Sequence, residues 1–132
     1  MVAAETPNRA RVLVVEDDID IQQALSRILE AEGYAVARAE NGRTALAHLE
    51  GPDRPCLILL DLMMPVMDGW QFRSELKRDP ALASIPVVIL SAHTQADPTG
   101  TLDAASYLKK PIDLDRLLAT VRRFCPEPSA DA

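Results

Sequence analysis

Short apolar runs alternate along the chain with longer segments of helical period. We predict strands at the apolar runs, which lie at residues 11–15, 34–38, 56–60, 86–90 and 105–108. We predict helices where apolar residues recur with helical spacing, at residues 19–31, 42–50, 69–78 and 113–124. This alternation is typical of βα units that form a parallel sheet with helices on both faces.

The boundaries of these segments support the same interpretation. The run at residues 56–60, CLILL, is apolar at every position, which predicts a central strand buried on both faces of the sheet. Gly33 is expected to end the first helix, Gly51 and Pro52 to end the second, and Asp113 to cap the last. Units of this kind most often form an open, doubly wound α/β sheet.

Polar residues follow four of the predicted strands at the point where each strand ends. Glu16 and Asp17 follow the first strand, Asp61 the third, Ser91 the fourth and Lys110 the fifth. Open α/β sheets carry their sites outside the carboxyl ends of the strands. We therefore expect these side chains to lie together at one edge of the sheet.

This set of residues predicts phosphoryl chemistry. Carboxylates from Glu16, Asp17 and Asp61 would repel one another unless a cation lay between them. Mg²⁺ prefers such oxygen ligands, and Mn²⁺ is the alternative with the same preference. Asp61, held at the end of a rigid strand, can attack a phosphoryl group as a nucleophile. Lys110 can balance the charge of that group, and the hydroxyl of Ser91 can donate a hydrogen bond to it.

The composition is that of one globular domain of 132 residues, with 48% hydrophobic and 26% charged residues. The apolar runs are too short to cross a membrane, and residues 1–10 lack the pattern of a secretory signal, so we expect a cytoplasmic protein. A net charge of −6 argues against direct binding to nucleic acid, because affinity for phosphate backbones comes mainly from Lys and Arg.

The cysteines and the chain ends are predicted to carry no chemistry. Cys56 and Cys125 are far apart in sequence and have none of the spacings of zinc or redox sites, so we expect two reduced structural thiols. Residues 1–10 and 125–132, rich in Ala, Pro and Glu, are expected to be flexible ends. Residues 11–124 would then form the folded domain.

Four motifs resemble the receiver domains of two-component response regulators. They are LVVEDD at residues 13–18, LLDLMMPVMDGW at residues 59–70, Ser91-Ala92 and Lys110-Pro111. The resemblance covers residues 11–124 and is to the single-domain type. It implies a flavodoxin-like (βα)5 fold, in which five parallel strands take the order 2-1-3-4-5.

The resemblance also implies a role for each residue of the metal site. Asp61 would accept the phosphoryl group from a sensor histidine kinase or a histidine phosphotransfer protein. Asp17 would bind Mg²⁺ directly, Glu16 would act through a water molecule, and Met63 would offer its backbone carbonyl to the metal.

The remaining implied roles belong to a conformational switch. Ser91 would move towards the phosphoryl group, Tyr107 would follow it inward, and Lys110 would pair with the phosphate. New charge and new hydrogen bonds would shift the protein between two conformations, and the shift would regulate a downstream protein partner.

One interval departs from the family pattern. Ser91 and Lys110 are separated by 110 − 91 = 19 positions, a few fewer than is usual, and Pro98 and Gly100 lie between them. We therefore expect the fourth helix of the fold to be shortened to about residues 100–105. In the family this region belongs to the face that partners bind.

Two other functions remain open from the sequence. A small-molecule phosphatase with an Asp nucleophile would need a second Asp two residues after Asp61, where this chain has Met63, and a substrate pocket for which no sequence is left. A degenerate receiver that serves only as a binding module would not need all three acidic residues, Glu16, Asp17 and Asp61.

Overall fold

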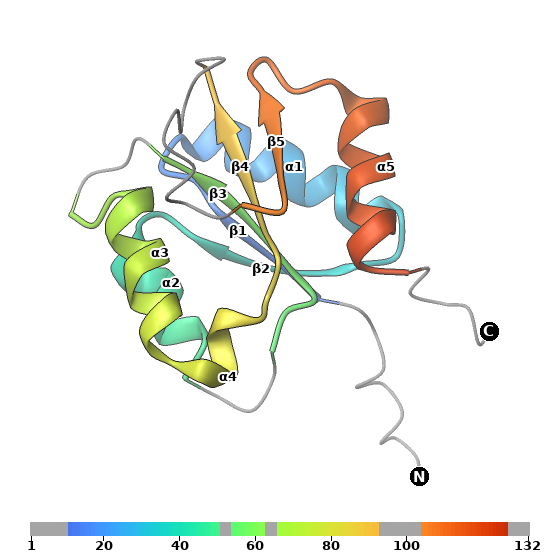
Figure 1. The fold of residues 1–132 in the computed structure, drawn as a ribbon. Coiled ribbons are helices and arrows are strands. Elements are labelled where there is room, and N and C mark those ends of the chain that lie inside the picture. The colour runs from blue at the N-terminus through green and yellow to red at the C-terminus, as the bar shows by residue number, and fades with distance from the viewer. Residues whose placement is uncertain (1–10, 51–53, 63–65, 93–103, 127–132) are drawn as a thin grey trace, which may run out of the picture.

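A five-stranded parallel sheet forms the centre of the protein (Figure 1). The computed structural model describes residues 11–50, 54–62, 66–92 and 104–126. The strands are β1 (Arg11–Val15), β2 (Ala35–Ala39), β3 (Leu57–Asp61), β4 (Val87–Ser91) and β5 (Ser106–Lys109). Their order in the sheet is β2-β1-β3-β4-β5, with every neighbouring pair parallel. The predicted flavodoxin-like α/β fold and its strand order are therefore confirmed.

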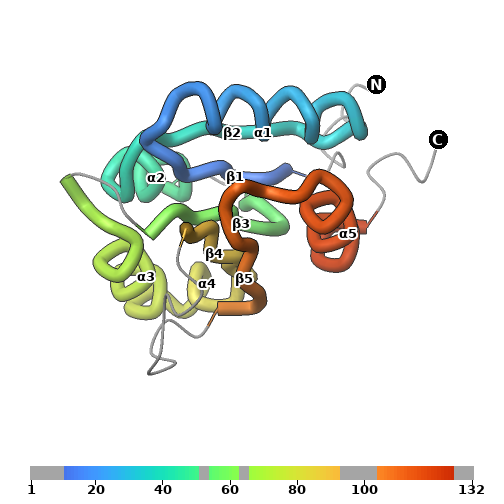
Figure 2. The backbone as a smooth tube through the Cα atoms, turned by 90° about the horizontal axis from the view of Figure 1, so that it is seen from above, coloured from blue at the N-terminus to red at the C-terminus, as the bar shows by residue number. Residues whose placement is uncertain are grey.

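Helices cover both faces of the sheet (Figure 2). They are α1 (Ile19–Ala31), α2 (Gly42–His48), α3 (Gly69–Arg78), α4 (Pro80–Ala83) and α5 (Leu114–Phe124). Helices α1 and α5 bury Leu25, Leu29, Leu117 and Val121 against one face. Helices α2, α3 and α4 contribute Ala45, Phe72, Leu76 and Leu82 to the core on the other. Strand side chains alternate between the two cores, which explains why β3 and β4 are buried along their whole length.

Strands β2 to β5 each begin and end one residue later than the sequence predicts. The apolar run alone cannot indicate the last paired residue, because a polar residue can continue the hydrogen-bonded ladder. Asp61 is in register with Leu90 of β4, and Ser91 is in register with Lys109 of β5. Both site residues are therefore the last residues of strands, with their backbones fixed by the sheet.

Short acidic and amide side chains cap the helices. Asp18 accepts hydrogen bonds from the backbone N–H groups of Asp20 and Ile21, and Asp68 accepts one from Gln71 in a complete capping box. Asp113 caps α5, as predicted. These aspartates have a structural role at the starts of the helices.

The sequence analysis missed α4, a short helix that directly follows α3. Asp79 caps it by accepting a hydrogen bond from the Ala81 N–H, and Pro80 occupies its first turn. A capping Asp followed by Pro is a helix-start signal, but the four-residue helix is too short for the hydrophobic spacing to indicate it. The predicted helix over residues 100–105 falls mainly on residues 93–103, which lie outside the described ranges.

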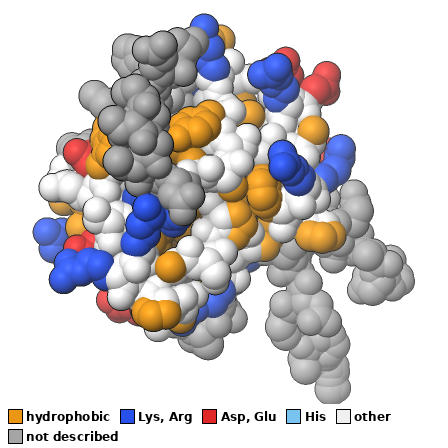
Figure 3. Space-filling view, viewed as in Figure 1, with side chains coloured by type: hydrophobic (Ala, Val, Ile, Leu, Met, Phe, Trp, Pro, Cys, Tyr) orange, Lys and Arg blue, Asp and Glu red, His pale blue; other side chains and the backbone are white. Residues whose placement is uncertain are grey.

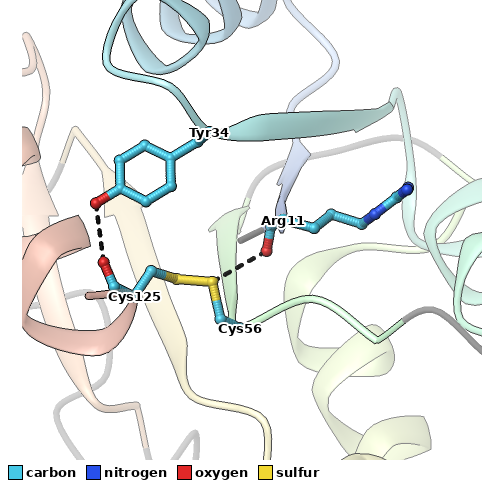
Figure 4. The surroundings of a disulfide bond; sticks show 4 residues. All are labelled: Arg11, Tyr34, Cys56 and Cys125. Atoms are coloured by element: carbon cyan, nitrogen blue, oxygen red, sulfur yellow. Dashed lines mark hydrogen bonds between the residues drawn. A yellow bond between two sulfur atoms is a disulfide. The ribbon is translucent and has the colours of Figure 1, made fainter. Parts of the chain in front are cut away.

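The expectation of two reduced thiols is wrong, because Cys56 and Cys125 form a disulfide (Figure 4). Their sequence separation is 69 residues, yet their Cα atoms are 5.6 Å apart. Cys56 lies just before β3 and Cys125 just after α5, which runs back across the sheet, so both reach the edge where the strands begin. Cys125, which the sequence analysis assigned to the flexible tail, is fully buried.

Gly69, the first residue of α3, lies against the end of β3. A Cβ atom there would be 2.8 Å from the Leu62 Cα and 3.1 Å from the Asp61 carbonyl oxygen, and neither backbone atom can rotate away. We expect Gly69→Ala to lower the free energy of unfolding by about 1–3 kcal/mol, as measured by urea denaturation. Gly42→Ala is the matched control, because the atoms nearest to its Cβ would belong to the Met67 side chain, whose Cγ and Sδ atoms can rotate away. Equal losses in the two variants would contradict this interpretation.

Candidate functional site

The carboxyl ends of the strands enclose a pocket of about 280 Å³. Its lining consists of Glu16, Asp17, Asp18, Ile21, Asp61, Ser91, Ala92 and Lys110. The residues predicted to meet at this edge, from the ends of β1, β3, β4 and β5, are all among them. They meet because parallel strands direct all their carboxyl ends to the same side of the sheet.

The pocket holds a cluster of acidic side chains. One carboxylate oxygen from each of Glu16, Asp17 and Asp61 lies within 4.8 Å of the others. Glu16 and Asp61 are buried, with exposed fractions of 0% and 5%, whereas Asp17 is exposed. Carboxylates this close repel one another, and burial adds to the cost, so the cluster favours a cation. Hard oxygen ligands without nitrogen or sulfur fit a divalent ion such as Mg²⁺.

Lys110 supplies a positive charge within this pocket. Its Nζ atom lies 2.8 Å from the Glu16 Oε1 atom and 3.6 Å from the Asp61 Oδ2 atom. Its backbone N–H donates a hydrogen bond of 2.7 Å to the Ser91 carbonyl, and its peptide bond to Pro111 is cis. From its position after β5, the lysine therefore faces both buried carboxylates.

The pKa of Lys110 reflects two opposing effects. Burial lowers the pKa. The hydrogen bond to Glu16 and the negative charges of Glu16 and Asp61 together raise the pKa by more than burial lowers it. The net pKa is above the ordinary value of 10.5. Lys110 is therefore a cation at neutral pH, with its ammonium group shared between two acidic partners.

This shift predicts where the ion pair stabilises the fold. Because the pKa is raised in the folded protein, the stabilisation is complete below the unfolded value of 10.5 and is lost as the pH rises through the folded pKa. In metal-free protein, we expect the difference in free energy of unfolding between wild type and Lys110→Met to stay constant from about pH 7 to 9. The difference should shrink only above pH 10.5. A difference that already falls between neutral pH and about pH 9 would contradict the assignment.

Gln22 supports this site from α1 without lining the pocket, and its role was not predicted from the sequence. Its buried Nε2 group donates hydrogen bonds to the Glu16 and Ala39 carbonyls, at 3.0 and 3.2 Å. It thus joins α1 to the ends of β1 and β2 and fixes the backbone that carries Glu16. A signal was present, because Gln22 is a polar residue on the same helical stripe as Leu25 and Leu29.

Two residues predicted for the site are not part of the described pocket. Tyr107 lies on β5 with 45% of its surface exposed and does not contribute to the lining. Met63, predicted to offer a backbone carbonyl, lies outside the described residues. Their predicted roles stay predictions.

The family model of the response regulator receiver domain matches residues 12–122. The chain belongs to this family. Protein PilH of Pseudomonas aeruginosa is 34% identical over 115 residues, a match that covers 85% of this chain and 94% of that protein. The receiver fold thus occupies nearly the whole chain described here.

Other similar proteins include a longer response regulator and a receiver domain with a bound magnesium ion. Response regulator MprA of Mycolicibacterium vanbaalenii is 36% identical, and the match covers 92% of this chain but only 52% of MprA, so this chain spans about half the length of that relative. The receiver domain of the sensor histidine kinase PA1611 from Pseudomonas aeruginosa, with a magnesium ion coordinated in its active-site cleft, is 28% identical. It superposes with a TM-score of 0.79 and covers 88% of this chain and 97% of the PA1611 chain.

Among the residues described by the structure, no helix has the length and apolar character needed to cross a bilayer.

Proposed function

We propose that this receiver accepts a phosphoryl group on Asp61, with Mg²⁺, and that phosphorylation changes its conformation to regulate a protein partner. The observation that supports the proposal most directly is the contact between Lys110 and the buried carboxylates of Glu16 and Asp61 in an open pocket. A structural ion pair would not need a third carboxylate, that of Asp17, beside it. A site that holds a doubly charged ion and a phosphoryl group would need this third carboxylate.

The proposed reaction transfers a phosphoryl group from the donor to the carboxylate of Asp61. An oxygen of Asp61 attacks the phosphorus of the donor, a new oxygen–phosphorus bond forms, and the donor's bond to phosphorus breaks with its electron pair leaving on the donor. Asp61 suits this role because β3 holds its backbone rigidly while its side chain faces the pocket. Lys110 lies close enough to balance the charge on the transferred group.

The metal in this proposal is Mg²⁺, with Mn²⁺ as the alternative. Asp17, Glu16 and Asp61 would hold it, together with the backbone carbonyl of Met63. When bound, the ion supplies positive charge that offsets the carboxylates and the incoming phosphoryl group. The buried, clustered carboxylates of this chain and the magnesium ion of the PA1611 receiver support this choice.

The proposed switch begins at Lys110 and Ser91. Before phosphorylation Lys110 lies nearer to Glu16 than to Asp61. Phosphorylation would replace the single negative charge of the Asp61 carboxylate by the roughly double charge of an acyl phosphate and draw the ammonium group towards it. Ser91, which lines the same pocket, would donate its hydroxyl to a phosphoryl oxygen, and Tyr107 on the adjacent strand would follow inward.

We propose a histidine kinase or a histidine phosphotransfer protein as donor, in the cytoplasm. An apolar groove of about 230 Å³ between α1 and the start of α5 supports a protein donor, because it shares Ile21 and Lys110 with the acidic pocket. The output is proposed to be a protein. The net charge of −6 and the spread of Lys and Arg side chains among other side chains on the face seen in Figure 3 give no support to a nucleic-acid surface.

A small phosphodonor tests the proposal without knowledge of the cognate kinase. Incubation with acetyl phosphate and Mg²⁺ should add one phosphoryl group to the protein, as observed by intact-protein mass spectrometry, and acetate is the leaving group. EDTA should prevent the addition. The absence of any addition at saturating acetyl phosphate and Mg²⁺ would leave the chain as a binding module and reject the proposal.

A further inference from the structure

The disulfide lies at the opposite edge of the sheet from the acidic pocket. Cys56 directly precedes β3, whose other end carries Asp61, and Cys125 directly follows α5, whose other end follows Lys110. The backbone N–H of Cys56 donates a hydrogen bond of 2.8 Å to the carbonyl of Arg11, the first residue of β1. The disulfide therefore joins the end of α5 to the start of β3, beside the start of β1.

The two sulfur atoms have different surroundings. Cys125 has 0% of its surface exposed and belongs to the core between the sheet and α5. Cys56 is only partly buried and lies at the edge of that core. Cys56 is therefore the more accessible of the two cysteines, and Cys125 is shielded by the protein.

The site also accommodates the reduced form. The Cys56 sulfur lies 3.1 Å from the Arg11 carbonyl oxygen, as drawn in Figure 4. A disulfide sulfur carries no proton, so this contact becomes a true hydrogen bond only when Cys56 is a thiol that can donate one. The buried Cys125 thiol would remain among apolar side chains, which suit a small hydrophobic group.

Two further contacts would hold α5 in place after reduction. The Tyr34 hydroxyl donates a hydrogen bond of 2.8 Å to the Cys125 carbonyl, and Arg122 forms an ion pair of 2.8 Å with Glu32 at the end of α1. Neither contact involves a sulfur atom. Breaking the disulfide would therefore remove a cross-link without releasing the helix from the sheet.

We propose that Cys56 and Cys125 form a reversible thiol–disulfide exchange site whose co-reactant is a dithiol. A thiolate of the dithiol attacks the Cys56 sulfur, the bond to Cys125 breaks, and Cys125 leaves with the electron pair and takes up a proton. The second thiolate of the dithiol then attacks the first sulfur of the dithiol, which is bonded to Cys56 in the mixed disulfide. The bond to Cys56 breaks, and Cys56 leaves as a thiol. The dithiol ends as a disulfide, and the protein gains two electrons and two protons.

Reversibility gives the site a regulatory meaning in the compartment proposed above. Disulfides in a reducing cytoplasm are generally transient and either catalytic or redox-sensing. This step alone rests on the proposed cytoplasmic function, since the exchange chemistry depends only on the two cysteines. Oxidation would tie α5 to the base of β3 and stabilise the receiver, and reduction would loosen that end of the domain.

The first test compares thermal unfolding of the oxidised protein with that of protein reduced by dithiothreitol. A bond that closes a loop of this length should raise the melting temperature by roughly 10 °C or more. Cys56→Ser/Cys125→Ala is the control, which should melt close to the reduced protein and not respond to dithiothreitol, because alanine suits the apolar surroundings of position 125. Equal melting temperatures for oxidised and reduced wild type, or no bond detected by mass spectrometry after incubation with oxidised glutathione, would overturn the proposal.

The second test examines which cysteine is attacked. Cys125→Ala leaves Cys56 as the remaining thiol, and Cys56→Ser leaves Cys125. With oxidised glutathione, we expect the mixed disulfide to form at least about tenfold faster in Cys125→Ala than in Cys56→Ser, because reactivity follows access. Circular dichroism would be used to check that both variants are folded. Equal rates, or faster reaction of Cys125, would contradict the proposed route. Neither test involves phosphorylation, so failure here is separate from failure of the proposed function.

Discussion

Asp61→Asn is expected to abolish phosphorylation by acetyl phosphate completely. The amide keeps the size of the side chain but lacks the anionic oxygen that attacks phosphorus. The fold should persist, because the substitution removes one of the clustered carboxylates and leaves Lys110 paired with Glu16 at 2.8 Å. Intact-protein mass spectrometry gives the readout, with one added phosphoryl group for wild type and none for the variant.

Asp68→Asn is the matched control for this experiment. Asp68 lies on the same side of the sheet at the start of α3, where it accepts a hydrogen bond from the Gln71 N–H. Asn is as good an N-cap as Asp, so the helix should remain capped. We expect the control to be phosphorylated like wild type. Phosphorylation of Asp61→Asn to the wild-type extent would show that another residue is the acceptor.

The second large effect concerns the metal and Asp17. Mg²⁺ at a hundredfold excess over its dissociation constant should raise the free energy of unfolding of wild type by about 2.7 kcal/mol. Asp17→Asn should lose this response, because the variant removes the one exposed carboxylate of the cluster. Thermal unfolding with and without Mg²⁺, each against an EDTA control, measures both quantities.

Asp18→Asn tests whether a carboxylate beside the site suffices. Asp18 is the neighbouring residue and lines the pocket, but its side chain accepts hydrogen bonds from Asp20 and Ile21 at the start of α1. An asparagine can make the same cap, so this variant should keep most of the Mg²⁺ response. A wild-type melting curve unchanged across millimolar Mg²⁺, or an equal response in Asp17→Asn and wild type, would contradict the proposed metal site.

The position of the site could be predicted from sequence for a physical reason. Each of its residues comes at the end of an apolar run, and a parallel sheet brings the ends of its strands to one edge. Glu16, Asp61, Ser91 and Lys110 are therefore near neighbours although they come from separate strands. The exact ends of the strands could not be predicted, because Asp61 and Ser91 are polar residues that nevertheless continue the ladder.

Other features depend on packing that a linear pattern does not contain. The pairing of Cys56 with Cys125 requires the direction in which α5 returns across the sheet, and sequence separation suggested the opposite conclusion. The role of Gln22 depends on two carbonyl groups from different strands meeting over α1. Both features arise from contacts between helices and strands. The hydrophobic pattern predicts the helices and strands themselves well, but not these contacts.

The central claim is that the phosphoryl group resides on Asp61, and chemical trapping measures this directly. Phosphorylated protein would be treated with borohydride, which reduces an acyl phosphate to an alcohol, then digested and sequenced by tandem mass spectrometry. The account predicts a reduced side chain at Asp61, formed only when acetyl phosphate and Mg²⁺ are both present. Trapping at Asp17 or any other acidic residue, with Asp61 unmodified, would contradict it.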